Sequence, residues 1–365
     1  ILCPAHSYRP VRSWAMAQTR RAAPVSSTAS AIHQWLYGKK FDEAFSLLAP
    51  TAFSMVGILC LSPYIALAVR TLLSPLCRLA GIDPGMLAGL LPIDMGGYQL
   101  AGELADNQVL GQYAGLGVSS TLGCTLAFTI PVGASLLPQT DQEAFAKGVV
   151  IGLLGLPVSL FTEWVLLCDV SVRLFLQQNA IPLLIAAAGG IGLWKFTDKA
   201  LWLFQKYVRL LQLILTVGLM LGAVAYLCRL PLNIVPVLDA MNTVSGIAIF
   251  LLGSLPLVLL LQRLLNRPLT ALGNRLQIGE DGNMGLLIGA VSPLPTLSMM
   301  SRMNETAKVI NAAFLVSGAS ALGAHLAFVY SVNPQATLTV LCGKLLGGCF
   351  AVLLACGIVR TTGRN

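Results

Sequence analysis

The residue with the clearest chemical potential is an acidic side chain inside an apolar run. Asp94 lies in the segment LPIDMGGY, after Pro92 and before Gly96, Gly97 and Tyr98. A carboxylate at the bilayer centre costs roughly 2.5–3.5 kcal/mol on insertion scales, so such a residue is a functional candidate by default. The proline and glycines interrupt a helix and free backbone carbonyls, and the tyrosine offers a face to a cation. We therefore predict a cation-binding site here, with helix capping by Asp94 as the alternative.

A second polar segment, SPLPTLS, contains Ser292, Pro293 and Ser298. Two prolines two residues apart cannot continue a helix. The hydroxyl groups can satisfy freed backbone groups or contact a substrate. We predict that this segment is the counterpart of the first site, and the alternative is an ordinary kinked turn near the cytoplasmic face.

Further ionisable residues fall within or beside apolar runs. His325 lies in the charge-free run 309–343, where a buried polar group is costly, so we expect a ligand or proton-relay role, with core packing as the alternative. Glu103 follows Asp94 by two or three helical turns and is expected to line the same cavity. Three other acids near the ends of runs are expected to be interfacial anchors: Glu163, Asp169 and Asp239.

The overall composition explains why these residues stand out. The chain has 365 residues, of which 56% are hydrophobic and only 10% charged, with a mean hydropathy of +0.78. A soluble domain carries about 25% charged residues, so this composition indicates a polytopic, all-α membrane protein. It excludes most soluble enzymes and nucleic-acid readers. The nine cysteines lack the spacing of a disulfide framework or zinc site, so we expect no cofactor and no metal.

Uncharged stretches of about 20 residues, long enough to cross the hydrocarbon, identify the membrane spans. We set aside residues 1–40, which are basic and free of acids, as a disordered or spurious N-terminal segment. The stretches 84–105 and 282–301 are too broken by proline or glycine to span, and we interpret both as re-entrant hairpins. With the N-terminus inside, lysine and arginine concentrate in the predicted inside loops. The eight expected spans are 44–69, 107–138, 148–167, 174–194, 207–228, 240–262, 309–330 and 335–359.

An internal repeat organises these spans. The segments LGCTLAF (122–128) and LGAHLAF (322–328) share five of seven residues at an offset of 200, which makes His325 the counterpart of Thr125. Gly81-Ile82-Asp83 similarly matches Gly279-Glu280-Asp281. An odd number of spans separates the copies, so the second copy is inverted, as is typical of secondary transporters. The predicted parts are a first repeat (41–173), two connecting helices (174–239) and an inverted second repeat (240–365).

The DMGGY segment, Asp94–Tyr98, resembles the ethanolamine-utilisation permease family (EutH type). The resemblance covers about residues 41–360. It departs from the family pattern at Ile93, at Ala324 and in Val291–Pro295, where the family usually has Asn, Asp and an Asn-x-Ile-Pro segment. The other matching segments are Phe41–Phe45, Phe53–Ile58, Phe128–Val132, Lys308–Phe314 and His325–Phe328.

The resemblance implies a multi-pass permease of the bacterial cytoplasmic (inner) membrane. It would take up ethanolamine, or a similar small hydroxylated ammonium compound, by alternating access. Asp94 would supply the counter-charge, Tyr98 the aromatic wall, and hairpin carbonyls or hydroxyls the hydrogen bonds. The expected partners are this substrate and the lipid bilayer; a homo-oligomer is compatible with the sequence, and a coupling ion, H⁺ or Na⁺, is left open.

Two alternatives to this function stay open. One is an ion-coupled transporter of a different small solute, in which the hairpin carbonyls hold the ion. The other, less favoured, is an intramembrane enzyme. An enzyme needs a paired nucleophile and base or a metal cluster, and the sequence offers only His325 with Glu305 or Asp94 as a pair, so we predict that the chain is not an enzyme.

Overall fold

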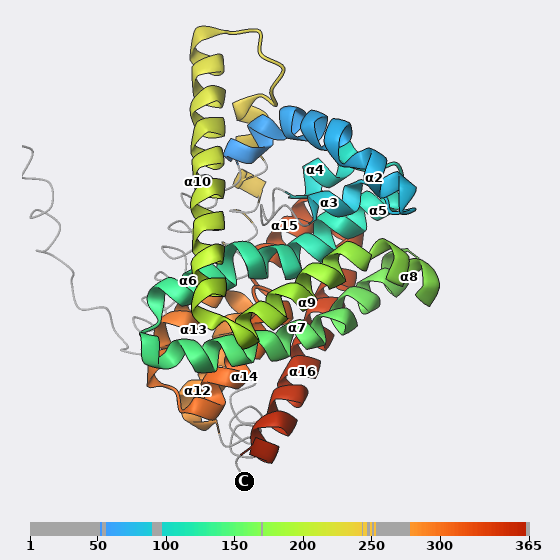
Figure 1. Ribbon diagram of the computed structural model, residues 1–365. Helices are drawn as coiled ribbons and strands as arrows, with labels where there is room; N and C mark the ends of the chain where they lie inside the picture. The colour runs from blue at the N-terminus through green and yellow to red at the C-terminus, as the bar shows by residue number, and fades with distance from the viewer. Residues whose placement is uncertain are drawn as a thin grey trace, which may run out of the picture.

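The computed structural model describes residues 56–89, 97–168, 171–242 and 278–362, with isolated positions at 52, 244–246, 249 and 252. Within these residues the chain is helical and contains no strand, as predicted (Figure 1). The helices of the first half are Val56–Leu72, α2 (Ser74–Leu79), α3 (Gly85–Ala88), α4 (Gly97–Leu104), α5 (Gln108–Gln112), the π-helices η2 (Tyr113–Gly123) and η3 (Thr125–Thr129), α6 (Ile130–Leu136) and α7 (Gln139–Leu167). Those of the second half are α8 (Val172–Gln178), α9 (Ala180–Lys195), α10 (Thr197–Cys228), α12 (Gly279–Val291), α13 (Pro293–Met299), η4 (Met300–Arg302), α14 (Glu305–Gly318), α15 (Ala324–Val332), η5 (Pro334–Ala336) and α16 (Thr337–Thr362).

Several helical stretches of the described residues are long and apolar enough to cross a membrane. Four do so as single stretches: Gln108–Leu136, Gln139–Leu167, Thr197–Cys228 and Pro334–Arg360. The pair α8 and α9, bent by 64°, adds a fifth if it forms one span. These stretches coincide with five predicted spans, because each covers an uncharged run of bilayer length. Of the others, 44–69 overlaps a shorter apolar helix, Val56–Leu72, and 240–262 lies mostly outside the described residues.

The prediction of one continuous span over 309–330 is wrong. Helix α14 ends at Gly318 and α15 begins at Ala324. In the connecting turn, Ser320 has a φ of 55°. The backbone N–H groups of Ser320 and Leu322 donate to carbonyls of α12, at 3.0 and 2.7 Å. A tertiary contact therefore replaces the intrahelical bonds that would have continued the helix.

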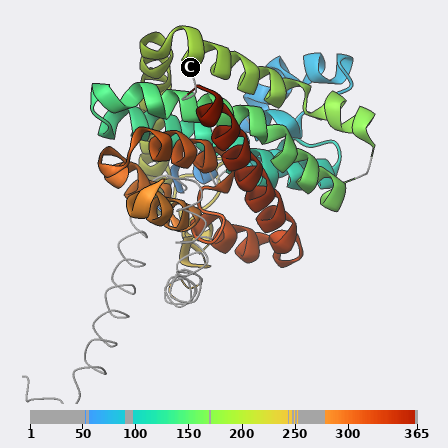
Figure 2. The same cartoon turned by 90° about the horizontal axis from the view of Figure 1, so that it is seen from below.

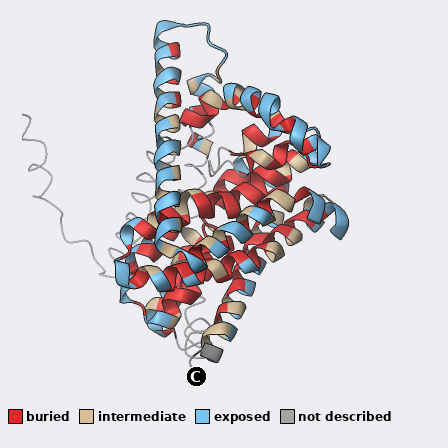
Figure 3. Ribbon diagram, in the orientation of Figure 1, coloured by how far each residue is buried: buried red, intermediate tan, exposed pale blue. Residues whose placement is uncertain are grey.

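Helix α7 lies at the centre of the described core. It packs most extensively against α16 and α14, and Figure 2 shows α16 running across it. Figure 3 shows η2 and much of α7 buried, whereas α10 is exposed along most of its length. The exposed residues of α10 include Leu213, Met220 and Leu227. Because large exposed apolar surfaces mark interaction with a membrane or a partner, this face of α10 suits contact with lipid.

An ion pair joins the first turns of α7 and α14. The Lys308 Nζ donates to Asp141 Oδ1 at 2.8 Å and to Glu305 Oε1 at 2.6 Å. The Lys308 and Asp141 side chains are each 8% exposed, whereas that of Glu305 is 72% exposed. The pair Lys308–Asp141 is therefore largely desolvated, and the contact with Glu305 is open to water.

We expect the variant Lys308→Met to be destabilised by roughly 3–5 kcal/mol, because it leaves Asp141 as a buried carboxylate without its cation. Thermal unfolding of the purified protein in detergent measures the effect. The variant Glu305→Gln is the matched control and should lose less than about 1 kcal/mol, since it removes only an exposed partner. Equal melting temperatures for the two variants would contradict the assignment.

Candidate functional site

The two glycines that flank residues 90–96, Gly89 and Gly97, both pack closely against η2. Asp94 and Gly96 fall in 90–96, outside the described residues. The flanking glycines are described: a methyl group added at Gly89 or Gly97 would lie 2.6 or 2.5 Å from the nearest atom of η2. A side chain larger than that of glycine at either position would therefore require η2 to move. The π-helical form of η2 is notable here, because wide helical turns occur frequently at functional sites.

The second hairpin breaks where its prolines predict. Helix α12 ends before Ser292, whose backbone is extended, and Pro293 opens α13, a position that proline favours. The Thr296 hydroxyl donates to the Gly285 carbonyl at 3.0 Å, which holds α13 back against α12. Ser298 is exposed and donates to a carbonyl of its own helix. The structure thus places Ser292 and Pro293 at the break and Ser298 on the outer face of α13.

The two hairpins begin in the same way. Gly81 and Gly279 have φ angles of 66° and 67°, a left-handed conformation that glycine adopts without steric cost. These are the two glycines that the sequence comparison aligned. In the first copy, the Asp83 carboxylate accepts three backbone N–H groups at 2.7–3.1 Å. Burial raises the pKa of this carboxyl, and the three donors oppose that rise.

The repeated Leu-Gly pairs make equivalent contacts with the hairpins. A methyl group at Gly123 would lie 3.0 Å from the carbonyl of Gly89, just after α3. A methyl group at Gly323 would overlap the carbonyl of Val291, the last residue of α12. Each glycine therefore lets its own helical segment approach the end of the first arm of the neighbouring hairpin closely.

The structure brings Tyr98 of the first hairpin to the second copy. Its ring centroid lies 6.0 Å from that of Phe328 on α15, with the planes at 81°. His325 precedes Phe328 by one helical turn and is 3% exposed, as expected for a core or cavity position rather than a lipid-facing one. Tyr98 and α15 thus join the two predicted repeats beside the segment that carries Asp94.

Glu103, near the end of α4, bonds with residues of the helix Val56–Leu72. The Ser62 hydroxyl donates to its Oε1 at 2.8 Å, and the Arg70 guanidinium contacts its backbone carbonyl. These bonds tie the end of α4 to the helix Val56–Leu72. The expected place of Glu103 in a shared cavity therefore finds no support among its bonds.

Sequence reasoning missed a buried acid. Glu163 was expected to be an interfacial anchor, but it is 0% exposed. It lies between η2 and α16, and methyl groups at Gly117 and Gly343 would overlap its side chain. The sequence does contain a sign of this burial, because Glu163 and Lys344 are opposite charges within otherwise apolar runs. That the two residues are buried near each other depends on the packing of helices that are distant in the sequence.

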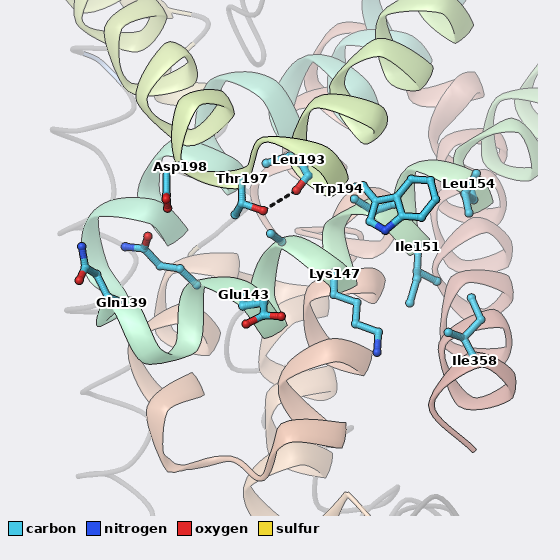
Figure 4. Close-up of a pocket in the computed structure, with 13 residues that line it drawn as sticks. Gln139, Glu143, Lys147, Ile151, Leu154, Leu193, Trp194, Thr197, Asp198 and Ile358 are labelled. Atoms are coloured by element: carbon cyan, nitrogen blue, oxygen red, sulfur yellow. Dashed lines mark hydrogen bonds between the residues drawn. The ribbon is translucent and has the colours of Figure 1, made fainter. Parts of the chain in front are cut away.

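A groove of about 880 Å³ lies apart from these residues, between α7, the junction of α9 and α10, and the end of α16 (Figure 4). Its charged lining residues are Glu143, Lys147 and Asp198. At the junction, the Thr197 hydroxyl donates to the Leu193 carbonyl at 2.6 Å. None of the predicted site residues that the structure describes lines this groove, so it does not define their site.

The helices and their apolar surfaces define a multi-pass, all-helical membrane protein. The family model described as "Ethanolamine utilisation protein, EutH" matches residues 25–358. The chain belongs to this family, as the DMGGY segment predicted. The match begins within the 1–40 segment that the sequence analysis set aside.

Individual relatives agree with the family match. A protein of Bacillus subtilis called "Uncharacterized protein YxeR" is 32% identical over 328 residues, covering 88% of each chain. A "Probable ethanolamine permease EutH" of Listeria monocytogenes is 32% identical over 86% of this chain and 85% of its own. The protein of the same name in Salmonella typhimurium is 31% identical, over 88% and 85% respectively. No solved structure matches the chain.

Proposed function

We propose that this protein is a permease that carries ethanolamine, or a similar small hydroxylated ammonium compound, across the bacterial cytoplasmic membrane. Family membership and the printed names of two relatives support a transporter of this substrate. The observation that carries the placement of the site is the contact between Tyr98 and Phe328. It joins α4, which follows the segment that carries Asp94, to α15, which begins after the break in the run 309–330.

In the proposed site, the substrate's ammonium group binds Asp94, and its hydroxyl group binds hairpin backbone or side chains. An ammonium ion that leaves water needs a counter-charge and replacement hydrogen bonds. Asp94 supplies the charge, and Tyr98 supplies an aromatic face worth about 0.5–2 kcal/mol to a cation. The remaining polar contacts come from carbonyls near Gly96 and Gly97. On the second copy, Ser292 and Pro293 at the break of the hairpin and His325 on α15 complete the set, whereas Ser298 lies on the outer face of α13 and takes no part.

The transport cycle follows from the proposed symmetry. Two copies related by inversion can exchange conformations, and the exchange moves a central site from one face of the membrane to the other. The contacts of Gly123 with the end of α3 and of Gly323 with the end of α12 support two copies built alike. The odd number of predicted spans between them supports their opposite orientation.

Counterflow in proteoliposomes tests this function. Vesicles preloaded with unlabelled ethanolamine should take up external labelled ethanolamine faster than protein-free vesicles. A panel of internal amines should reproduce the effect only for small hydroxylated ammonium compounds. Counterflow with an unrelated solute alone, dependent on sodium, would favour the ion-coupled alternative. No counterflow with any amine would overturn the proposal.

A further inference from the structure

Glu163 is a buried carboxylate that the proposed substrate site does not use. It lies on α7, is 0% exposed, and neither of its carboxylate oxygens has a hydrogen-bond partner among the described residues. An ionised carboxylate without donors in a low-dielectric interior carries an uncompensated desolvation penalty of several kcal/mol. A group kept at such a cost inside a membrane protein is typical of proton relays in pumps and transporters.

The Glu163 side chain packs tightly against two helices. A methyl group at Gly117 of η2 or at Gly343 of α16 would overlap the Glu163 side chain. On these two sides no room is left for an organic ammonium ion or a hydrated sodium ion. A proton needs no such space, because it adds no heavy atom.

Two further buried hydroxyl groups, those of Ser159 and Ser317, lie on the side of Glu163 that faces α14. Together with Glu163 they form a polar strip. A methyl group at Gly347, one turn beyond Gly343, would lie 2.5 Å from the Ser159 Cβ and 3.0 Å from the Ser317 Cβ. The Ser159 and Ser317 hydroxyls are both buried and, like Glu163, without a hydrogen-bond partner among the described residues. Beside Ser317, the Val316 carbonyl accepts the Thr125 hydroxyl at 2.9 Å. The strip therefore ends at the repeated segment of the first copy.

The ionisable groups facing Glu163 come from two neighbouring helices. From α16, Lys344, which directly follows the Gly343 that contacts Glu163, is 1% exposed and donates to the Ser120 carbonyl at 2.6 Å. From η2, the Tyr113 hydroxyl donates to Asn179 Oδ1 at 2.8 Å. On α14, Lys308 is occupied by its bonds at the opposite end of α7. Lys344 is thus the cation that can favour release of a proton from Glu163.

We propose that Glu163 carries the proton that couples transport to a proton gradient. This inference rests on the proposed function and names its coupling ion. The carboxylate takes up one proton from water on one side and becomes neutral. When the repeats exchange conformation, the carboxyl releases that proton to water on the other side and regains its charge beside Lys344.

Proteoliposomes that contain a pH-sensitive dye test the coupling. Labelled ethanolamine is supplied at slightly acidic pH, where the amine stays protonated, and protein-free vesicles report the leak of neutral amine. With the wild-type protein, amine entry should change the internal pH by more than it does in protein-free vesicles. With Glu163→Gln, counterflow should continue at the wild-type rate while the pH change is lost. Glu143→Gln is the matched control, an identical change at an exposed position of α7, and should move protons like the wild type.

Three outcomes would overturn the proposal: wild-type transport without proton movement, E163Q moving protons normally, or a folded E163Q without counterflow. A second variant covers the case in which E163Q fails to fold. Glu163→Asp keeps a titratable group and should shift the pH profile of proton movement, and an unchanged profile also overturns the proposal. Absence of amine counterflow in the wild type would instead overturn the proposed function.

Discussion

Replacing Asp94 with asparagine should lower the affinity for ethanolamine by two orders of magnitude or more. Asparagine keeps the size of the side chain and its capacity to cap a helix, but it removes the counter-charge. A buried cation without a counter-charge carries a cost of several kcal/mol, and about 1.4 kcal/mol corresponds to a tenfold change in affinity. Uptake of labelled amine as a function of concentration, at a pH where the amine is charged, measures the loss.

Asp83 provides the matched control for this experiment, because it begins the same hairpin and differs in role. Its carboxylate accepts three backbone N–H groups, so Asp83→Asn should lower thermal stability and leave the affinity near the wild-type value. Asp94→Asn should show the reverse pattern. Normal uptake by Asp94→Asn would refute the counter-ion role.

Replacing Gly323 with alanine should destabilise the protein by about 1–3 kcal/mol or more, the usual range for overpacking, and should abolish most amine uptake. The added methyl group would overlap the Val291 carbonyl, a backbone atom that cannot turn aside as a side chain can. Relief of this overlap would pull α12 away from the bonds that its carbonyls accept from Ser320 and Leu322. The change thus acts on the hairpin and on the broken helix together.

Thermal unfolding and counterflow of the purified variant measure both effects. Gly357→Ala on α16 is the control, because no atom lies within 4 Å of the added methyl group, and it should behave like the wild type. Gly123→Ala should show a smaller loss, since its nearest atom is 3.0 Å away. Unchanged stability and counterflow in Gly323→Ala would refute the role of this contact.

The sequence by itself determined the class of protein, most of the described spans and the breaks set by local chemistry. An uncharged run of bilayer length becomes a spanning helix because its backbone must satisfy its own hydrogen bonds in lipid. Helix α12 ends before Ser292 because proline cannot continue it. Gly81 and Gly279 were aligned as repeats from sequence alone, and both adopt a conformation in which the absence of a side chain matters. The DMGGY segment, together with the other matching segments, predicted the family that the family model confirms.

Only the tertiary structure decided which polar groups are buried and where the long run 309–330 breaks. The run carries no Asp, Glu, Lys or Arg and predicts one helix, but the N–H groups of Ser320 and Leu322 find acceptors on α12 instead. Glu163 stands near the end of its run and predicts an interfacial anchor, but η2 and α16 cover it through Gly117 and Gly343. Helix periodicity and length are properties of consecutive residues. Burial and helix breaks of this kind depend on partners brought together by packing from distant parts of the chain.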